Sequence, residues 1–201
     1  FTRNVFRTQA FHDGMFEVQD AASQMVATFM DVVPCMRVVD ACAGAGGKTL
    51  HIAALMKNKG KILALDTKSN KLAELKKRAA RADAKNIETK LIDSSKVIKR
   101  LKDTADRLLL DVPCSGLGVL RRNPDTKWKL TPEELEREKK IQQEILMNYS
   151  SMVKPGGKMI YTVCSILKSE GEEQIKMFLK NEKEKWILKS EKKIMRLALY
   201  K

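Results

Sequence analysis

The sequence alternates short apolar runs with longer segments whose apolar residues recur at helical spacing, and this alternation constrains the fold more than any other feature. Five segments are predicted to be strands: Arg37–Ala41, Lys61–Asp66, Ile87–Ile92, Arg107–Asp111 and Lys158–Thr162. Three segments between them are predicted to be helices: Thr49–Met56, Ser69–Ala82 and Pro132–Val153. Such alternation is typical of an α/β protein with a parallel, doubly wound sheet, whose ligands bind at the carboxyl ends of the strands.

The size and charge of the chain limit its partners. Its 201 residues, 43% of them hydrophobic, are enough for one sizeable packed domain. The formal net charge of +14 favours a polyanion, which leaves RNA, DNA or an anionic membrane. No apolar run reaches the roughly 18 residues that a spanning helix needs, and no signal peptide is visible. We expect a cytoplasmic, monomeric protein, and the strand-end motifs described below favour RNA over a membrane partner.

A glycine-rich turn, CAGAGGKT, follows the first predicted strand and begins two residues after Asp40. Glycines between a strand and a helix let the backbone approach a ligand closely. A phosphate-binding P-loop would need a glycine at position 42, where this sequence has Cys42. A dinucleotide-binding fingerprint would match Gly44 and Gly46, but this sequence has Thr49 where the third glycine or alanine should be. S-adenosylmethionine has no phosphate and needs only a tight turn with hydrogen-bonding groups, so it is the third candidate.

Acidic residues end or follow the first three predicted strands, at Asp40, Asp66 and Asp93. Asp66 lies about 20 residues beyond the glycines, where a carboxylate accepts hydrogen bonds from ribose hydroxyls. Asp93 is placed to meet an adenine edge. One such residue is equally well explained as a helix cap or a turn residue. Three in register favour a ligand that contains a nucleoside, and NAD fits this pattern as well.

The chain has four cysteines, and they form no CxxC pair: Cys35, Cys42, Cys114 and Cys164. We therefore expect free thiols and no bound metal. Cys114 and Cys164 each follow a predicted strand, within DVPCSG and TVCS, so both thiols should lie over one crevice. The alternative for each is a buried cysteine that packs as a small apolar side chain.

Two thiols at one site suit chemistry on a pyrimidine ring. A thiolate is a strong, soft nucleophile, and its addition to C6 makes C5 carbanion-like and able to take a methyl group. A second thiol can act as the base that removes the C5 proton. Asp111, beside Cys114, is placed to hydrogen-bond the ring and favour cytosine. These residues alone do not decide which cysteine is the nucleophile.

Four segments together resemble the Sun/Nop2-type (Fmu-like) RNA cytosine-5 methyltransferases. They are VQDAAS (Val18–Ser23), DACAGAGGKT (Asp40–Thr49), DVPCSGLGVLRRNPDTKW (Asp111–Trp128) and KPGGKMIYTVCSI (Lys154–Ile166). The resemblance runs from about Phe11 to Leu179. It implies a class I, Rossmann-like methyltransferase with a mostly parallel, seven-stranded sheet. It also implies S-adenosylmethionine as methyl donor, S-adenosylhomocysteine as product and cytosine C5 in RNA as acceptor.

The same resemblance implies roles for individual residues. Cys164 resembles the nucleophile and Cys114 the cysteine that releases the product, while Lys48 and Asp111 are expected to serve both catalysis and donor binding. The donor-binding residues that it implies are Cys42, Ala43, Gly44, Ala45, Gly46, Gly47, Lys48, Asp66, Asp93 and Asp111. By family analogy the substrate is expected to be ribosomal RNA first and transfer RNA second. A catalytically idle RNA-binding module with the same fold is the alternative.

Basic residues follow Cys114 in the segment that should contact RNA. The expected contacts are Arg121, Arg122, Lys127 and Trp128. Cations bind phosphates and an exposed aromatic ring stacks on bases, although an ordinary solvated loop has the same composition. The Lys-rich segments Lys68–Arg81 and Lys176–Lys193 are predicted to be solvated faces.

The two ends of the chain differ from the family pattern. Members generally close on an antiparallel hairpin. Here the candidate strands Trp186–Lys189 and Arg196–Lys201 are joined only by Glu191–Met195, which indicates a shortened hairpin. The chain starts at Phe1, and Gly14–Met30 is predicted to be a loop and a helix. We expect residues 1–30 to be the remnant of a longer N-terminal region and residues 31–201 to form the methyltransferase domain.

Overall fold

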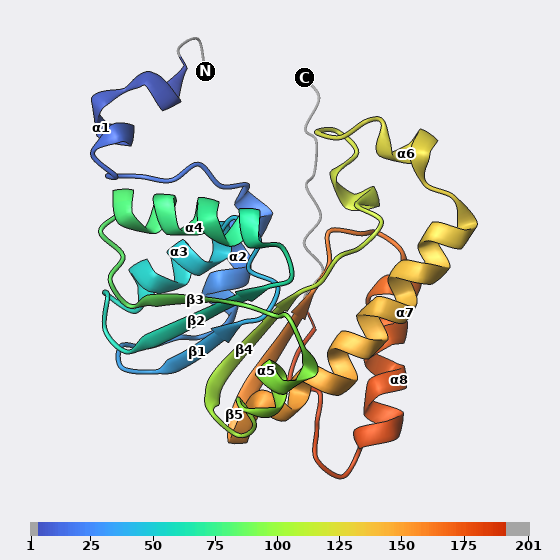
Figure 1. Ribbon diagram of the computed structural model, residues 1–201. Helices are drawn as coiled ribbons and strands as arrows, with labels where there is room; N and C mark the ends of the chain where they lie inside the picture. Colours follow the sequence, from blue (N-terminus) through green and yellow to red (C-terminus); the bar gives the residue numbers. More distant parts are fainter. Residues whose placement is uncertain (1–3, 192–201) are drawn as a thin grey trace.

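The computed structural model describes residues 4–191, and its centre is a parallel sheet (Figure 1). The strands are β1 (Arg37–Asp40), β2 (Lys61–Asp66), β3 (Ile87–Leu91), β4 (Ala105–Asp111) and β5 (Val153–Thr162). Their order in the sheet is β3-β2-β1-β4-β5, and every neighbouring pair is parallel. The parallel, doubly wound α/β prediction is therefore confirmed. Within residues 4–191 the sheet has five of the seven strands that the resemblance implies.

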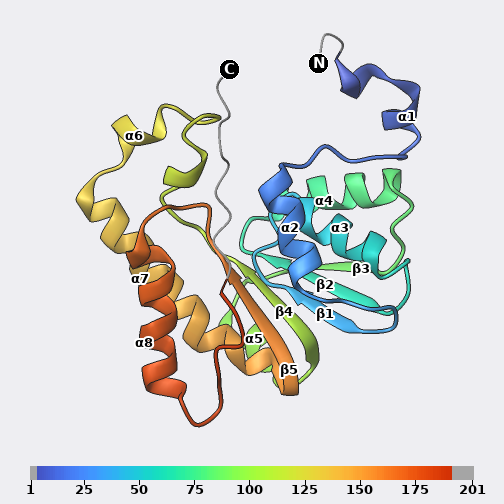
Figure 2. The same cartoon turned by 180° about the vertical axis from the view of Figure 1, so that it is seen from behind.

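Helices cover both faces of the sheet (Figures 1 and 2). One face carries α2 (Ala21–Phe29), α3 (Gly47–Leu55) and α4 (Ser69–Arg81). The other carries α5 (Ser95–Lys99), α7 (Pro132–Tyr149) and α8 (Glu172–Glu182). The short helices α1 (Gln9–His12) and α6 (Thr126–Lys129) lie outside these layers. The single-turn 3-10 helices are η1 (Val5–Arg7), η2 (Leu117–Val119), η3 (Ser150–Met152) and η4 (Lys168–Glu170).

The core forms on both faces because successive strand side chains point to opposite sides. Val38 of β1 belongs to the cluster that contains Ile52 of α3. Leu108 of β4 belongs to a second cluster, together with Leu146 of α7 and Phe178 of α8. All five are almost fully buried, and each such side chain contributes about 1.5–3 kcal/mol through its removal from water.

Helix α7 is shorter than predicted. It begins at a capping box, in which Thr131 and Glu134 satisfy each other's backbone N–H groups and Pro132 occupies the first turn. It ends at Tyr149 rather than Val153, because Val153 already pairs with Ala105 as the start of β5. The sheet thus takes Val153, which the apolar spacing assigned to the helix, while Ser150–Met152 form η3.

The described lysines of both Lys-rich segments are exposed, as predicted, but other side chains of these segments make structural contacts. Arg78 and Arg81 of α4 form ion pairs with Glu17 in the lead-in segment, and Arg78 also donates to the Ala45 carbonyl at 2.8 Å. In the second segment, Phe178 of α8 is buried in the core. Its ring packs against Trp186 with the ring centroids 5.9 Å apart.

The predicted hairpin is only partly within the described residues. Trp186–Lys189 has no regular secondary structure among the described residues, and Arg196–Lys201 lies outside them, so the shortened hairpin stays a prediction. No helix within residues 4–191 is both long and apolar enough to cross a membrane.

Candidate active site

The carboxyl ends of the central strands bring the predicted residues to one edge of the sheet. Asp40 of β1 pairs in register with Ala64 of β2 and Leu109 of β4. Asp111 of β4 is in register with Thr162 of β5. The turns that leave β1, β2, β4 and β5 therefore start at nearly the same level, and the site is built from these turns (Figure 1).

The turn after β1 requires its glycines. Gly44 and Gly46 both have positive φ values, 54° and 88°. A Cβ at Gly46 would lie 2.5 Å from Cγ of Leu75, whereas a Cβ at Gly44 would enter open space. Gly46 also precedes α3, whose first turn has no side-chain cap, so its N–H groups are available to an anionic group.

Two aspartates hold the turn from below. Asp40 is buried and accepts a hydrogen bond from the Thr49 hydroxyl at 2.7 Å. Burial raises the pKa of Asp40 to about 7. Asp66 accepts from the Gly44 N–H at 2.9 Å and, with its other oxygen, from the Lys68 N–H at 2.8 Å. The Asp66 carboxylate is thus fixed at the end of β2, with lone pairs left for a ligand hydroxyl.

Two other predicted residues lie at different distances from the turn. Asp111 forms an ion pair with Lys48, with Nζ 2.6 Å from Oδ2, so α3 and β4 are joined across the crevice. Asp93 follows β3, is exposed and accepts a hydrogen bond from the neighbouring Ser94 hydroxyl at 3.0 Å. The structure therefore joins Lys48 to Asp111 and leaves Asp93 at the rim.

The two cysteines predicted to share a crevice are in contact. The Sγ atoms of Cys114 and Cys164 lie 3.2 Å apart. The Gly118 N–H donates to the Cys164 carbonyl at 2.9 Å, and a Cβ at Gly118 would lie 2.9 Å from that same oxygen. The loops after β4 and β5 can approach this closely because residue 118 has no side chain.

The contact makes the two thiols unequal. The hydrogen bond from Cys114 lowers the pKa of Cys164 to about 7, and Lys48 acts in the same direction. The same hydrogen bond, with burial, raises the pKa of Cys114 well above its ordinary value. Cys164 is also the more exposed of the two. When the pair loses one proton, the charge therefore lies on Cys164 and the remaining proton on Cys114.

A buried carboxylate beneath the cysteine loops was missed by sequence reasoning. Glu170 closes η4 and accepts hydrogen bonds from the backbone and hydroxyl of Ser115. Ser115 in turn lies 3.1 Å from the hydroxyl of Ser165. The available signal was that a serine follows each of the two cysteines.

The predicted RNA-contacting residues lie on the exposed segment around α6. Trp128 is 80% exposed, and the Lys127 ammonium lies 4.6 Å from the centre of its indole ring. Arg121 is exposed, whereas Arg122 forms an ion pair with Asp20 at 3.0 Å. The segment thus presents cations and one aromatic ring, and Arg122 also joins it to the lead-in before α2.

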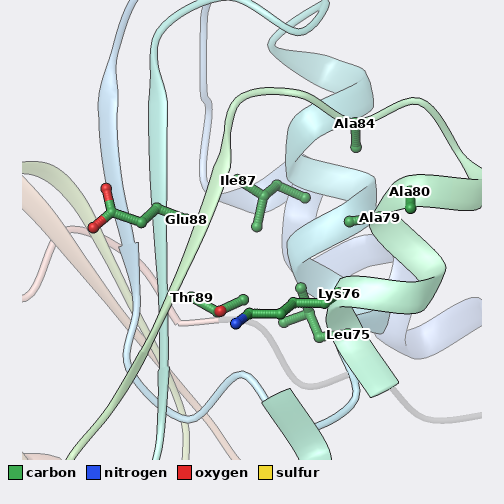
Figure 3. A pocket seen from close by; sticks show the side chains of 8 residues that line it. All are labelled: Leu75, Lys76, Ala79, Ala80, Ala84, Ile87, Glu88 and Thr89. Carbon is green, nitrogen blue, oxygen red and sulfur yellow. The ribbon is translucent and has the colours of Figure 1, made fainter. Parts of the chain in front are cut away.

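A separate cavity of about 420 Å³ lies between α4 and β3 (Figure 3). Its lining includes Leu75, Ala79, Ile87 and Thr89. None of the predicted catalytic or donor-binding residues lines it. The chemistry therefore gathers at the strand ends and not in this cavity.

The residues present fit an S-adenosylmethionine ligand. Gly44 leaves space above the turn, and the first N–H groups of α3 can receive a carboxylate. Asp66 has acceptor capacity for ribose hydroxyls. This donor and acceptor set matches an amino acid joined to a nucleoside and contains no phosphate-wrapping loop.

The fold with its glycine turn after β1 defines a class I, Rossmann-like methyltransferase. The match to a family model extends over residues 27–197, and that model is described as 16S rRNA methyltransferase RsmB/F. The chain belongs to this family, which confirms the Sun/Nop2-type resemblance.

Individual relatives agree with the family. The probable ribosomal RNA small subunit methyltransferase B of Bacillus subtilis (strain 168) is 38% identical over 173 residues, which is 86% of this chain and 39% of that protein. The tRNA (cytosine(72)-C(5))-methyltransferase NSUN6 of Mus musculus is 35% identical over 170 residues, which is 79% of this chain and 35% of that protein.

A solved structure of NSun6 from Pyrococcus horikoshii with SFG has a TM-score of 0.81 and 28% identity, and the match covers 89% of this chain and 46% of that one. The chain spans about two fifths of the length of the first curated relatives that it matches.

Proposed function

We propose that this chain contains the catalytic core of an RNA cytosine-5 methyltransferase that uses S-adenosylmethionine and releases S-adenosylhomocysteine. The observation that carries the proposal is the 3.2 Å contact between the two thiols beside the glycine turn. Binding of a methyl donor alone would need no such pair, whereas a covalent route to pyrimidine C5 uses a nucleophile and a base together. In this proposal residues 31–201 form the catalytic domain, residues 1–30 are its lead-in, and the location is cytoplasmic.

The glycine turn and its aspartates would hold the donor. Its methionine part would lie against Cys42–Lys48 with the carboxylate near Lys48, its ribose on Asp66 and its adenine toward Asp93. When bound, the donor supplies an electrophilic methyl group. Asp111, which Lys48 orients, would contact both the donor and the target base.

In the covalent mechanism, Cys164 would be the nucleophile and Cys114 the base. The Cys164 thiolate adds to C6, and the electrons of the C5–C6 double bond move to C5, which takes the methyl group. Addition removes the Cys164 thiolate, whose hydrogen bond raised the pKa of Cys114, so Cys114 can then lose its proton to solvent. The Cys114 thiolate removes the C5 proton, the double bond re-forms and the bond from sulfur to C6 breaks.

The RNA would approach over the exposed segment around α6. Arg121 and Lys127 would bind phosphates and Trp128 a base, and Arg122 would exchange its ion pair with Asp20 for a phosphate. The target cytosine has to leave its stack, which costs least in a single strand or loop. Ribosomal RNA is the proposed substrate, since the family description and the Bacillus subtilis relative both name it. Transfer RNA is the second candidate, because the mouse relative is named for it.

Covalent trapping tests the chemistry. RNA that contains 5-azacytosine should form a complex that survives denaturing electrophoresis, because it has no C5 proton to lose, and Cys164→Ala should abolish this complex. Cys114→Ala should instead trap ordinary RNA. Absence of both complexes with donor and substrate RNA present would refute the mechanism.

Two further measurements separate the alternatives. Bisulfite sequencing of ribosomal and transfer RNA from cells with and without the gene would identify the substrate. Calorimetry with S-adenosylmethionine would detect an idle module, which would bind RNA but not the donor.

A further inference from the structure

We infer that Glu170 is a positioning residue that holds the two cysteine loops at the distance at which their thiols share one proton. This inference rests on the proposed function, because it concerns the thiol pair that the mechanism uses. Glu170 does not reach the reacting atoms, so it would act through Ser115 and Ser165, the residues that directly follow Cys114 and Cys164.

Glu170 contacts three separate parts of the fold. Its side chain is wholly buried, and Oε1 accepts from the Ser115 N–H at 2.8 Å and from the Gln142 amide of α7 at 3.0 Å. Oε2 accepts from the Ser115 hydroxyl. Its main-chain carbonyl accepts from the Tyr161 hydroxyl of β5 at 2.7 Å. One residue therefore joins the loop after β4, helix α7 and strand β5.

The direction of the hydrogen bonds follows from the carboxylate. Because an ionised carboxylate only accepts, the Ser115 hydroxyl must donate to Glu170, and its oxygen is left to accept from the Ser165 hydroxyl. The Ser165 oxygen in turn accepts from the Leu167 N–H at 3.1 Å. A single one-way chain of hydrogen bonds thus runs from the loop after β5 to the loop after β4 and ends on Glu170.

The charge of Glu170 is unusual for its location. None of the ion pairs among residues 4–191 includes it. A buried carboxylate without a cation is costly unless hydrogen bonds compensate it, and here only neutral donors do so. Burial raises the pKa of Glu170, but the hydrogen bonds from Ser115 and Gln142 hold it below the ordinary value. The three hydrogen bonds that its side chain accepts therefore join the loop after β4 to helix α7.

A neutral amide would tie these parts of the fold together less strongly. In Glu170→Gln one carboxylate oxygen becomes an NH₂ group. Facing the Gln142 amide, it would leave that donor without an acceptor; facing the Ser115 hydroxyl, it would force that hydroxyl to accept and so reverse the chain toward Ser165. Either arrangement replaces hydrogen bonds to a carboxylate by weaker neutral ones, and we expect the loop after β4 to shift. The Sγ atoms, now 3.2 Å apart, would separate and share a proton less well.

Capture by phenylarsine oxide tests the spacing without RNA or methyl donor. The arsenic forms two bonds to sulfur, and its oxygen leaves as water with the two thiol protons. Glu170→Gln should weaken capture at least about tenfold, since the second bond depends on the geometry of the pair. The matched change Glu173→Gln, on the exposed side of α8, should leave capture unchanged, and Cys114→Ser should abolish it.

Two functional measurements follow. With positioning lost, kcat should fall about 100-fold while the Kd for S-adenosylmethionine stays at its wild-type value. The pKa of Cys164, measured from its alkylation rate, should rise toward that of a free thiol.

A second variant decides the outcome if Glu170→Gln does not fold. Ser165→Ala breaks the chain of hydrogen bonds but leaves Glu170 bound to Ser115 and Gln142, and it should weaken capture in the same direction. Wild-type capture in a folded Glu170→Gln, or in Ser165→Ala if Glu170→Gln does not fold, would overturn the inference. Failure of RNA trapping with intact thiol capture would instead contradict the proposed function.

Discussion

Removal of the Cys114 thiol should change the charge state of its neighbour by an amount that the structure defines. The hydrogen bond from Cys114 is the main cause that lowers the pKa of Cys164 to about 7. Without it, the pKa should return toward the free-thiol value of about 8.5. At pH 7 these two values correspond to about one half and about 3% of thiolate, so the alkylation rate of Cys164 in Cys114→Ala should fall about 15-fold.

The assay is alkylation by iodoacetamide between about pH 5 and pH 9, with the peptide that contains Cys164 quantified by mass spectrometry. Cys35, which is exposed, serves as the internal reference. Cys114→Ser keeps a hydroxyl donor and should retain most of the effect. An unchanged midpoint for Cys164 in Cys114→Ala would refute this account of the thiolate. A midpoint near pH 7 on Cys114 in the wild type would show that the two roles are reversed.

Three further predictions concern donor binding, pH dependence and the core. Lys48→Met should weaken S-adenosylmethionine binding at least about tenfold by calorimetry, because it removes a charge-assisted hydrogen bond, and an unchanged Kd would exclude Lys48 from the donor site. Burial raises the pKa of Asp40 from 3.8 to about 7, so the stability linked to its proton is complete below about pH 4 and is lost as pH rises through 7. In urea titrations, the free energy of unfolding of the wild type should fall by on the order of 4 kcal/mol across this pH range, and that of Asp40→Asn should not. The same pH dependence in both proteins would argue against a raised pKa of Asp40. Phe178→Ala should lower the free energy of unfolding by about 3–5 kcal/mol in urea, and a change below about 1 kcal/mol would mean that α8 adds little to the core.

Much of the sheet was predictable because the central strands β1, β2 and β4 contain short apolar runs. The predicted range of β2, Lys61–Asp66, is the observed one. The start of β5 was not predictable from local pattern, because Pro155 and Gly156 indicate a turn. Pairing with β4 overrides that signal, and a proline is tolerated because β5 is an edge strand among the described residues.

The site shows the same division between local and distant information. The contact between Cys114 and Cys164 follows from two strand ends in a parallel sheet, so motif spacing was sufficient to predict it. Glu170 was not predictable, because its burial depends on a partner 55 residues away, Ser115. The role of Glu17 likewise depends on Arg78, 61 residues further along the chain. Single-sequence patterns carry no information about such pairs.

The register of β5 against β4 sets the positions of Cys114 and Cys164 relative to each other. Asp111 lies opposite Thr162, and each cysteine follows its strand by only two or three residues. A slip of one residue would move Cys164 by about 3.3 Å and turn alternate side chains to the opposite face. The irregularity in this pair lies at the far end, between Ala105 and Arg107. Core substitutions that loosen β5 should therefore disturb the alignment of the two thiols at smaller losses of stability than those that unfold the protein, although none of these side chains touches a reacting atom.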